Sequence, residues 1–258
     1  MESAVVLSSG NINHNYIETL NSIKKSGFKN VFIKWYDRDY ALQNKELEYA
    51  RQLGLNIIFA HLGYDYINDL WNDCGDYLVS RYKSDIKTCF DNGINLVVMH
   101  LCAGFDAPMY NEMGIRRLKE IASYAEELGV RIAFENTKVQ GYQEYVLSNI
   151  HNKNVGICFD IGHVHAHFKD KFNFELFKDK IFAVHIHDNN GELDEHLIPF
   201  DGNINYKYYL KKLKECNYNG PMTLELYYTK YYLNTNLDSY YKKGYEVSNT
   251  LIDMYNNI

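Results

Sequence analysis

The stretch VGICFDIGH at residues 155–163 contains the pattern that decides the fold. Five small or apolar residues, typical of a strand buried on both faces, lead to the carboxylate of Asp160, and a glycine and a histidine follow. RIAFEN at 131–136, IFAVHIHD at 181–188 and MTLEL at 222–226 have the same design. Buried strands that each end in an ionisable side chain predict an α/β protein with its chemistry at one end of the sheet.

Working outward, apolar strand-like runs recur along the whole chain. They are residues 4–7, 30–35, 56–62, 95–101, 131–136, 155–160, 181–187 and 222–226. Helical patterns lie between most of them, at 16–25, 42–53, 77–92, 115–128, 206–216 and 237–255, with a short, weakly patterned sixth helix around 174–179. This alternation, without a flexible linker or charge block, predicts parallel βα units in one domain spanning 1–258.

The length of 258 residues is close to the roughly 250 typical of a (β/α)8 barrel. A doubly wound open sheet would show the same alternation, but it does not predict what the strand ends carry. Glycine-bearing dipeptides that predict left-handed helix ends precede several strands. They are 26–27, 53–54, 92–93, 128–129 and 219–220. We therefore expect a single (β/α)8 TIM barrel.

The bulk composition restricts the partners of the protein. The net charge of −6, without a Lys/Arg cluster, argues against nucleic acid as a partner, although a carboxylate-rich metal site itself adds negative charge. Five cysteines, odd in number and without a CxxC pair, fit reduced thiols in a cytoplasmic protein. We find neither a secretory leader nor an apolar run of about 18 residues, so we expect no membrane span.

Metal-competent side chains end six successive strands. In chain order they are His61, His100, Glu135, Asp160, His185 and Glu225. A single histidine or glutamate at such a place is more often hydrogen-bonded or solvated than a ligand. Carboxylates that converge on one barrel axis repel each other unless a cation neutralises them, so the full set indicates a metal site. Mixed imidazole and carboxylate ligands suit Zn2+, Mn2+, Fe2+ or Co2+ better than Ca2+.

The loops after strands six and seven hold a second group. His163 follows Asp160 at three residues, with Gly162 allowing a tight exit, and Asp194 and His196 are two apart. Together, His163, Asp194 and His196 predict either a further cation site or a substrate-contacting loop.

Other ionisable residues in these loops receive lesser roles. We expect His165 and His167 at the surface or behind the ligands. Asp188 is expected to orient a ligand imidazole through its other nitrogen. We expect His187 to point away from the barrel interior and not to be a ligand.

Jointly, five motifs resemble the xylose-isomerase-like TIM barrels, which include sugar and sugar-phosphate isomerases and epimerases and the endonuclease IV type of abasic-site nuclease. They are FEN at 134–136, FDIGH at 159–163, HIHDN at 185–189, DEH at 194–196 and LEL at 224–226, and the match runs through nearly the whole chain. The resemblance implies that both branches share a four-ligand site. Its ligands are Glu135, Asp160, His185 and Glu225.

In the endonuclease branch, the resemblance implies two further metal groups. One contains His61 and His100 with Glu135, and the other contains His163, Asp194 and His196; this sequence matches all nine positions. The segment 192–202 is more similar to the short substrate loop of the isomerases, but Phe200 and Asp201 depart from its glycine-rich form. Relatives often self-associate, so a homo-oligomer is an open possibility.

The leading hypothesis is an isomerase or epimerase of a small sugar, a sugar phosphate or a related hydroxy-carbonyl compound. One to three Zn2+, Mn2+ or Co2+ ions would stabilise an enediolate, with Glu135 and Glu225 as base and acid on opposite faces. His163 would bind a substrate hydroxyl, and Trp35, Tyr64 and Phe105 would wall the pocket. The alternatives are a zinc phosphodiesterase acting at abasic sites in DNA and a metal-bearing sugar-binding protein without catalysis.

Overall fold

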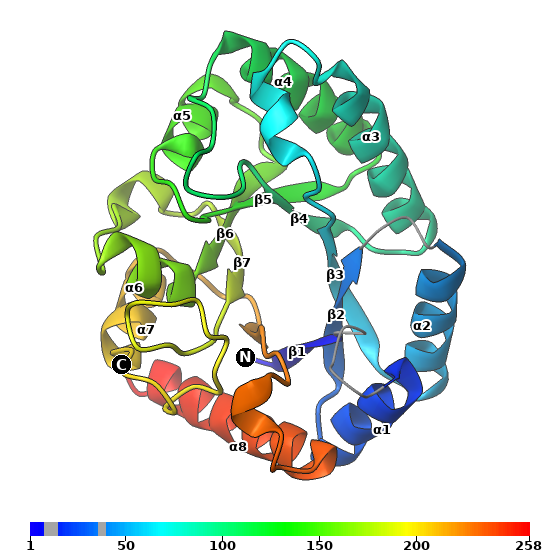
Figure 1. The fold of residues 1–258 in the computed structure, drawn as a ribbon, viewed down its shortest axis with the longest axis vertical. Helices are drawn as coiled ribbons and strands as arrows, with labels where there is room; N and C mark the ends of the chain where they lie inside the picture. Colours follow the sequence, from blue (N-terminus) through cyan, green and yellow to red (C-terminus); the bar gives the residue numbers. More distant parts are fainter. Residues whose placement is uncertain (8–14, 36–39) are drawn as a thin grey trace.

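A closed ring of parallel strands forms the centre of the molecule (Figure 1). The computed structural model describes residues 1–7, 15–35 and 40–258. The strands are β1 Ser3–Leu7, β2 Asn30–Trp35, β3 Asn56–Leu62, β4 Leu96–His100, β5 Arg131–Glu135, β6 Val155–Asp160, β7 Ile181–His185 and β8 Met222–Leu224. They pair in the order β7-β6-β5-β4-β3-β2-β1-β8, and a parallel bridge between Ile186 and Leu224 joins the two ends. The prediction of a TIM barrel is confirmed.

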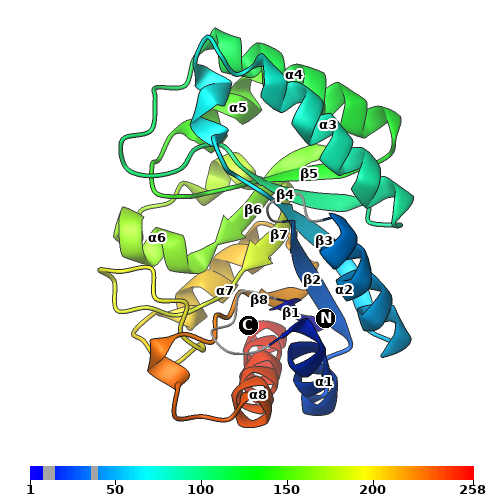
Figure 2. The ribbon, with the colours of Figure 1, turned by 45° about the vertical axis from the view of Figure 1, so that its right-hand side comes forward.

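Helices follow the strands and form the outer layer (Figure 2). They are α1 Tyr16–Ser26, α2 Tyr40–Gln52, α3 Asp76–Asp91, α4 Glu112–Glu127, α5 Tyr142–Asn149, α6 Ile161–Phe168, α7 Tyr206–Glu215 and α8 Leu237–Asn256. Short 3-10 turns add η1 Ile67–Trp71, η2 Phe174–Phe177 and η3 Lys230–Tyr232. In the described ranges, no helix combines the length and apolar character that a bilayer crossing requires.

The histidine-rich segment after β6 is helical, which the sequence pattern did not predict. The expected sixth helix at 174–179 is only the 3-10 turn η2, and the helix of this unit is α6, which begins directly after Asp160. The carboxylate of Asp160 accepts the backbone N–H of His163 at 2.6 Å and so caps the first turn of α6. Asp160 is therefore both the last residue of β6 and the N-cap of α6. The sequence pattern also did not predict α5, which begins after a short loop that follows β5.

Four of the five predicted glycine-bearing helix ends adopt the left-handed conformation. They are Gly27, Gly54, Gly93 and Gly129, with φ from 68° to 115°. The prediction for Gly220 was wrong, because Asn217 supplies the left-handed residue after α7 instead, with φ 59°. Asparagine tolerates this conformation better than most residues, which explains how the stop moved three positions upstream.

A small apolar layer fills the barrel and forms the floor of the site. It consists of Val6, Phe32, Phe59, Leu96, Val98, Ala133, Cys158 and Ala183, two from β4 and one each from β1, β2, β3, β5, β6 and β7. The rings of Phe32 and Phe59 stack with centroids 4.5 Å apart, and the His185 ring stacks on Phe32 at 5.2 Å. The apolar floor therefore fixes the plane of an imidazole that belongs to the polar layer above it.

Candidate metal centre

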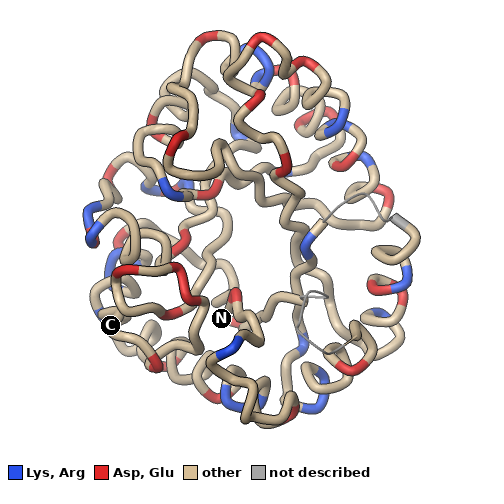
Figure 3. Tube along the Cα trace, in the orientation of Figure 1, with Lys and Arg blue, Asp and Glu red and all other residues tan. Residues whose placement is uncertain are grey.

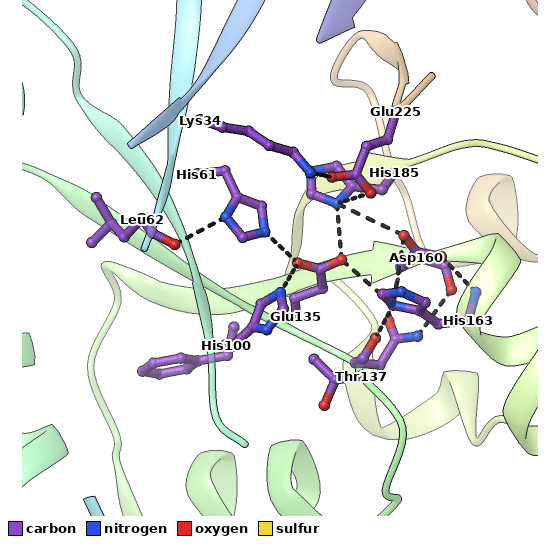
Figure 4. A network of polar contacts seen from close by, with 12 residues as sticks. Lys34, His61, Leu62, His100, Glu135, Thr137, Asp160, His163, His185 and Glu225 are labelled. Carbon is purple, nitrogen blue, oxygen red and sulfur yellow. Dashed lines mark hydrogen bonds and ion pairs between the residues drawn. The ribbon is translucent and has the colours of Figure 1, made fainter. Parts of the chain in front are cut away.

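Side chains from seven strand ends converge on a cavity of about 200 Å3 at the C-terminal mouth of the barrel (Figure 4). The residues around this centre are Lys34, His61, His100, Glu135, Asp160, His185 and Glu225, together with His163 from α6. The structure thus brings together all six predicted strand-end residues. Parallel strands make this possible because all their carboxyl ends lie at one edge of the barrel.

Glu135 lies at the middle of the group, with imidazoles on both of its oxygens. Its Oε1 is 2.9 Å from Nδ1 of His185, and its Oε2 is 2.9 Å from Nε2 of His61 and 3.1 Å from Nε2 of His100. Burial alone would raise the pKa of this carboxyl group, but the neighbouring His185 and His100 outweigh it and hold the pKa well below its usual range. Glu135 is therefore a charged carboxylate that two separate histidine groups share.

Four donors form a compact set on one side of Glu135, and the set fits a divalent cation. One donor atom each from Glu135, Asp160, His185 and Glu225 lies within 4.8 Å of the others, and all four residues are buried. Asp160 Oδ2 and His185 Nε2 have no hydrogen-bond partner in the described part of the chain. Three buried carboxylates this close together, one of them with an unpartnered oxygen, are costly without neutralising charge, and the donor types are those of Zn2+, Mn2+ or Co2+.

Lys34 is a site residue that the sequence analysis missed. Its ammonium lies 2.6 Å from Glu225 Oε1, with the two side chains only 5% and 3% exposed, and 4.1 Å from the ring centre of Tyr227. The hydroxyl of Tyr227 also donates to Glu225 Oε1 at 3.1 Å. Burial raises the pKa of Glu225, but Lys34, ahead of His185, draws it far below its usual range. The sequence did contain a signal, because NVFIKW is an apolar run with a single lysine. A lysine in a buried strand is rare unless a partner neutralises its charge.

His61 and His100 form a second group on the other oxygen of Glu135. Their ring centres are 4.9 Å apart, and His61 Nδ1 donates to the carbonyl oxygen of Leu62 at 3.0 Å, which turns its Nε2 toward Glu135. Tyr64 stacks on His100 with ring centres 4.2 Å apart and lines the cavity, as predicted.

The other two predicted wall residues lie elsewhere. Trp35 is 3% exposed and belongs to the core between strands and helices, because it faces outward at the position after Lys34. Phe105 is 68% exposed and packs edge-on against His167. The described residues that line the cavity include Cys102, Thr137 and Lys138 in their place.

A third group lies beside the cavity, and we name it the loop cluster: His163, His187, Asp194 and His196. His163 Nε2 is 3.2 Å from Asp194 Oδ2, and His196 Nε2 is 3.3 Å from Asp194 Oδ1. The structure therefore brings the predicted trio together from α6 and from the loop between β7 and α7.

The expectation that His187 points away from the interior was wrong. Its Nε2 is 3.2 Å from Asp160 Oδ1 and 3.6 Å from Asp194 Oδ1, and its ring stacks on His196 at 3.9 Å. Residues two apart in extended chain share a face, so His187 follows His185 inward. Burial lowers the pKa of His187, but the Asp160 carboxylate reverses this and raises it to about 9.

Asp188 holds the loop rather than an imidazole. Its Oδ2 accepts the backbone N–H of Phe200 at 2.7 Å, and its Oδ1 accepts those of Asn189 and Ile204 at 2.9 and 3.2 Å. The expected contact with a ligand ring is replaced by these backbone amides, because the loop 189–204 folds back over the end of β7.

The two remaining histidines of α6 lie behind the loop cluster, as expected. His165 lies 2.9 Å from Asp170 and 2.6 Å from Asn203 through its two ring nitrogens. His167 stacks on His163 at 5.8 Å, and burial lowers its pKa to about 4.

Comparison with known proteins assigns the chain to a family. Residues 24–251 match the family described as xylose isomerase-like TIM barrel, and the chain belongs to it. Among curated relatives, an uncharacterized protein of Methanocaldococcus jannaschii is 33% identical over 69% of this chain and 53% of its own length. An inosose isomerase of Bacillus velezensis is 28% identical over 69% of each chain, and a probable endonuclease 4 of Mesoplasma florum is 28% identical over 52% of this chain and 51% of its own length.

Solved structures agree with this fold over the full chain. A D-tagatose 3-epimerase-like protein superposes with a TM-score of 0.77 at 25% identity, covering 100% of this chain and 99% of that one. The IolI protein, solved with a bound zinc atom, superposes with a TM-score of 0.79 at 22% identity over 99% of both chains. The chain spans about half the length of the first curated relatives that it matches.

Proposed function

We propose that this protein is a divalent-metal-dependent isomerase or epimerase of a small sugar, a sugar phosphate or a related hydroxy-carbonyl compound. One observation carries the proposal. Glu135 from β5 and Glu225 after β8 approach the same atom, His185 Nδ1, from different sides, at 2.9 and 3.5 Å. Two ionised carboxylates on different sides of one small cavity are what a proton transfer across two faces of a substrate requires.

Glu135, Asp160, His185 and Glu225 would hold the cation. When bound, Zn2+, Mn2+ or Co2+ would polarise a carbonyl and a neighbouring hydroxyl oxygen of the substrate and so acidify the carbon between them. The cation would bind only when the His185 imidazole is deprotonated, because a proton and the metal compete for the same ring nitrogen.

Glu225 is the stronger candidate for the base. Lys34 and the Tyr227 hydroxyl both lie on its Oε1 and keep the carboxylate charged, so Oε2 is the oxygen that would accept a proton from the substrate. Glu135 has imidazoles on both oxygens, and a proton on it can exchange with His61 or His100. Proton transfer at Glu135 therefore involves a second residue, whereas Glu225 would hold the proton itself.

The cavity supports a small substrate. Its volume of about 200 Å3 is below the ~300–1,000 Å3 of typical drug-sized sites, and polar side chains dominate the lining. The related inosose isomerase and the similar D-tagatose 3-epimerase-like structure support hydroxy-ketones as the class to test.

The test is hydrogen exchange at carbon. The Co2+- or Mn2+-loaded protein is incubated with ketohexoses, ketopentoses, their phosphates and inososes in D2O, and NMR follows loss of the signal from the proton next to the carbonyl. We expect one class to exchange and isomerise, with Glu225→Gln inactive and Lys119→Gln, an exposed surface control on α4, active. Full metal loading with no exchange on any of these compounds would refute the proposal.

A second function has its own supporting observation. His61 and His100 lie on Glu135 Oε2, opposite the four-donor set, so Glu135 could bridge two cations, and the loop cluster offers a third position. Clustered cations suit phosphodiester hydrolysis, and the probable endonuclease 4 of M. florum is related. About three zinc ions per chain together with cleavage of an abasic oligonucleotide would favour this function over the isomerase.

A further inference from the structure

The loop cluster contains one more donor than the family resemblance assigns. His187 is fully buried, and neither of its ring nitrogens makes a hydrogen bond in the described part of the chain, although Nε2 has an ion-pair contact of 3.2 Å with Asp160 Oδ1; Asp194 Oδ1 likewise makes none and has only contacts of 3.3 and 3.6 Å with His196 and His187. A buried imidazole without hydrogen bonds is costly, so a missing partner is expected at this point. We propose that His163, His187, Asp194 and His196 form a closed four-donor site for a Zn2+-type cation, with His187 as the fourth donor.

The distances fit such an ion. Donors at about 2.0–2.1 Å from a tetrahedral zinc lie roughly 3.3 Å apart. Nε2 of His187 and Nε2 of His196 lie 3.6 and 3.3 Å from Asp194 Oδ1, and Nε2 of His163 lies 3.2 Å from the other oxygen, Oδ2. One donor atom from each of the four residues lies within 4.8 Å of the other three, so a small movement of side chains completes the shell.

Two of the imidazoles are already oriented as ligands. His163 Nδ1 donates to the carbonyl oxygen of Asn136 at 2.8 Å, and His196 Nδ1 donates to that of Glu225 at 3.0 Å. A carbonyl oxygen only accepts, so in the neutral rings the lone pair is on Nε2, which faces Asp194. Both carbonyls belong to strand ends of the barrel, so the cluster is held rigidly on its inner side.

The place of His187 is fixed by packing. Gly162 in α6 lies directly against the ring: a Cβ there would be 2.0 Å from Cε1 and 2.4 Å from Nδ1 of His187. The glycine that the sequence suggested for a tight exit from β6 therefore makes room for this imidazole. On its other face the ring stacks on His196 at 3.9 Å.

A fourth protein donor changes what the ion can do. Structural zinc sites have four protein ligands, whereas catalytic sites keep a position open for water. The ion in the loop cluster would tie the part of the β7–α7 loop that carries Asp194 and His196 to α6, through His163, and to the end of β7, through His187. It would be a structural ion beside the isomerase site, rather than the third catalytic cation that phosphodiester hydrolysis would need.

The experiment counts ions and reads their coordination in the metal-free full chain titrated with Co2+. His187→Gln and Asp194→Asn are compared alone and together, with His165→Gln as the matched control on α6. Circular dichroism and urea denaturation of the metal-free variants verify folding, and His187→Phe, which keeps a ring on His196, serves as the second variant. No sugar is involved, so the outcome is independent of the proposed isomerase activity.

We expect wild type to bind one Co2+ that Asp194→Asn loses and that shows the intense visible absorption of tetrahedral Co2+. His187→Gln and His187→Phe should each lower the affinity for this same ion by more than about 100-fold, beyond the 10–100-fold typical of a supporting residue. The double variant His187→Gln/Asp194→Asn should lose no further ion compared with Asp194→Asn alone. His165→Gln should match wild type. The proposal is overturned if no ion depends on Asp194, or if the Asp194-dependent ion keeps its affinity and spectrum in the His187 variants.

Discussion

Replacing Lys34 by methionine should destabilise the metal-free protein more than the metal-loaded protein. The Lys34–Glu225 pair has an N–O distance of 2.6 Å and is almost fully buried. Removing one partner of a buried ion pair typically costs about 3–5 kcal/mol, because the other charge stays buried and unpaired. In the metal-free protein, Lys34→Met should therefore lower the free energy of unfolding by about that amount.

A bound cation changes this balance, because Glu225 then has another positive charge beside it. The cost of Lys34→Met in the loaded protein should be smaller by roughly 2–3 kcal/mol. Thermodynamic linkage converts that difference into metal binding about 30- to 140-fold tighter than in wild type. Lys34 would then act as a resident counter-charge that keeps the site ordered before metal arrives.

The assay is urea denaturation with EDTA and with saturating Zn2+, together with competition titration against a chelating dye. Lys138→Met is the matched control, since Lys138 also lines the cavity but lies over the Phe105 ring at 5.3 Å; it should change stability by less than about 1 kcal/mol in either state. Equal destabilisation of both states by Lys34→Met, or metal binding weaker than wild type, would refute the reasoning.

Three other outcomes are expected. Glu225→Gln should reduce kcat by about 10²–10⁴-fold with an unchanged circular dichroism spectrum, measured on the substrate found by hydrogen exchange; turnover within three-fold of wild type would contradict the role of Glu225. The pKa of His187 is raised from its ordinary 6.5 to about 9, so its contribution of about 3 kcal/mol is fully present below pH 6.5 and is lost as the pH rises through 9. EDTA-treated protein should therefore lose stability to urea between pH 6 and pH 9, His187→Gln should lose less, and a flat profile for wild type would argue against a protonated His187. Gly162→Ala should cost about 1–3 kcal/mol through overpacking against the His187 ring, measured by thermal melting; equal melting temperatures for wild type and Gly162→Ala would contradict the close packing.

Much of the candidate site could be predicted before the structure because a barrel turns sequence order into position. Each parallel strand delivers its last side chain to the same mouth, so His61, His100, Glu135, Asp160 and Glu225 needed only their strand ends to be found. The same logic, applied with the correct period of two, would also have placed His187 inward.

Lys34 and the local structure of α6 could not be predicted in this way. Nothing in the run NVFIKW says that its lysine meets a glutamate 191 positions later, and the alternating histidines after Asp160 give no helical signal.

The sequence by itself determined the barrel, the edge that carries the chemistry and the types of donor gathered there, since these depend on local apolar runs and on what ends them. Only the tertiary structure decided which donors meet: that Glu135 stands between two histidine groups, that Lys34 neutralises Glu225, and that Gly162 admits the His187 ring. The physical reason is that pairing distances and packing gaps depend on side chains from strands and loops far apart in the chain, and the pattern within any one segment contains no information about its neighbours across the barrel.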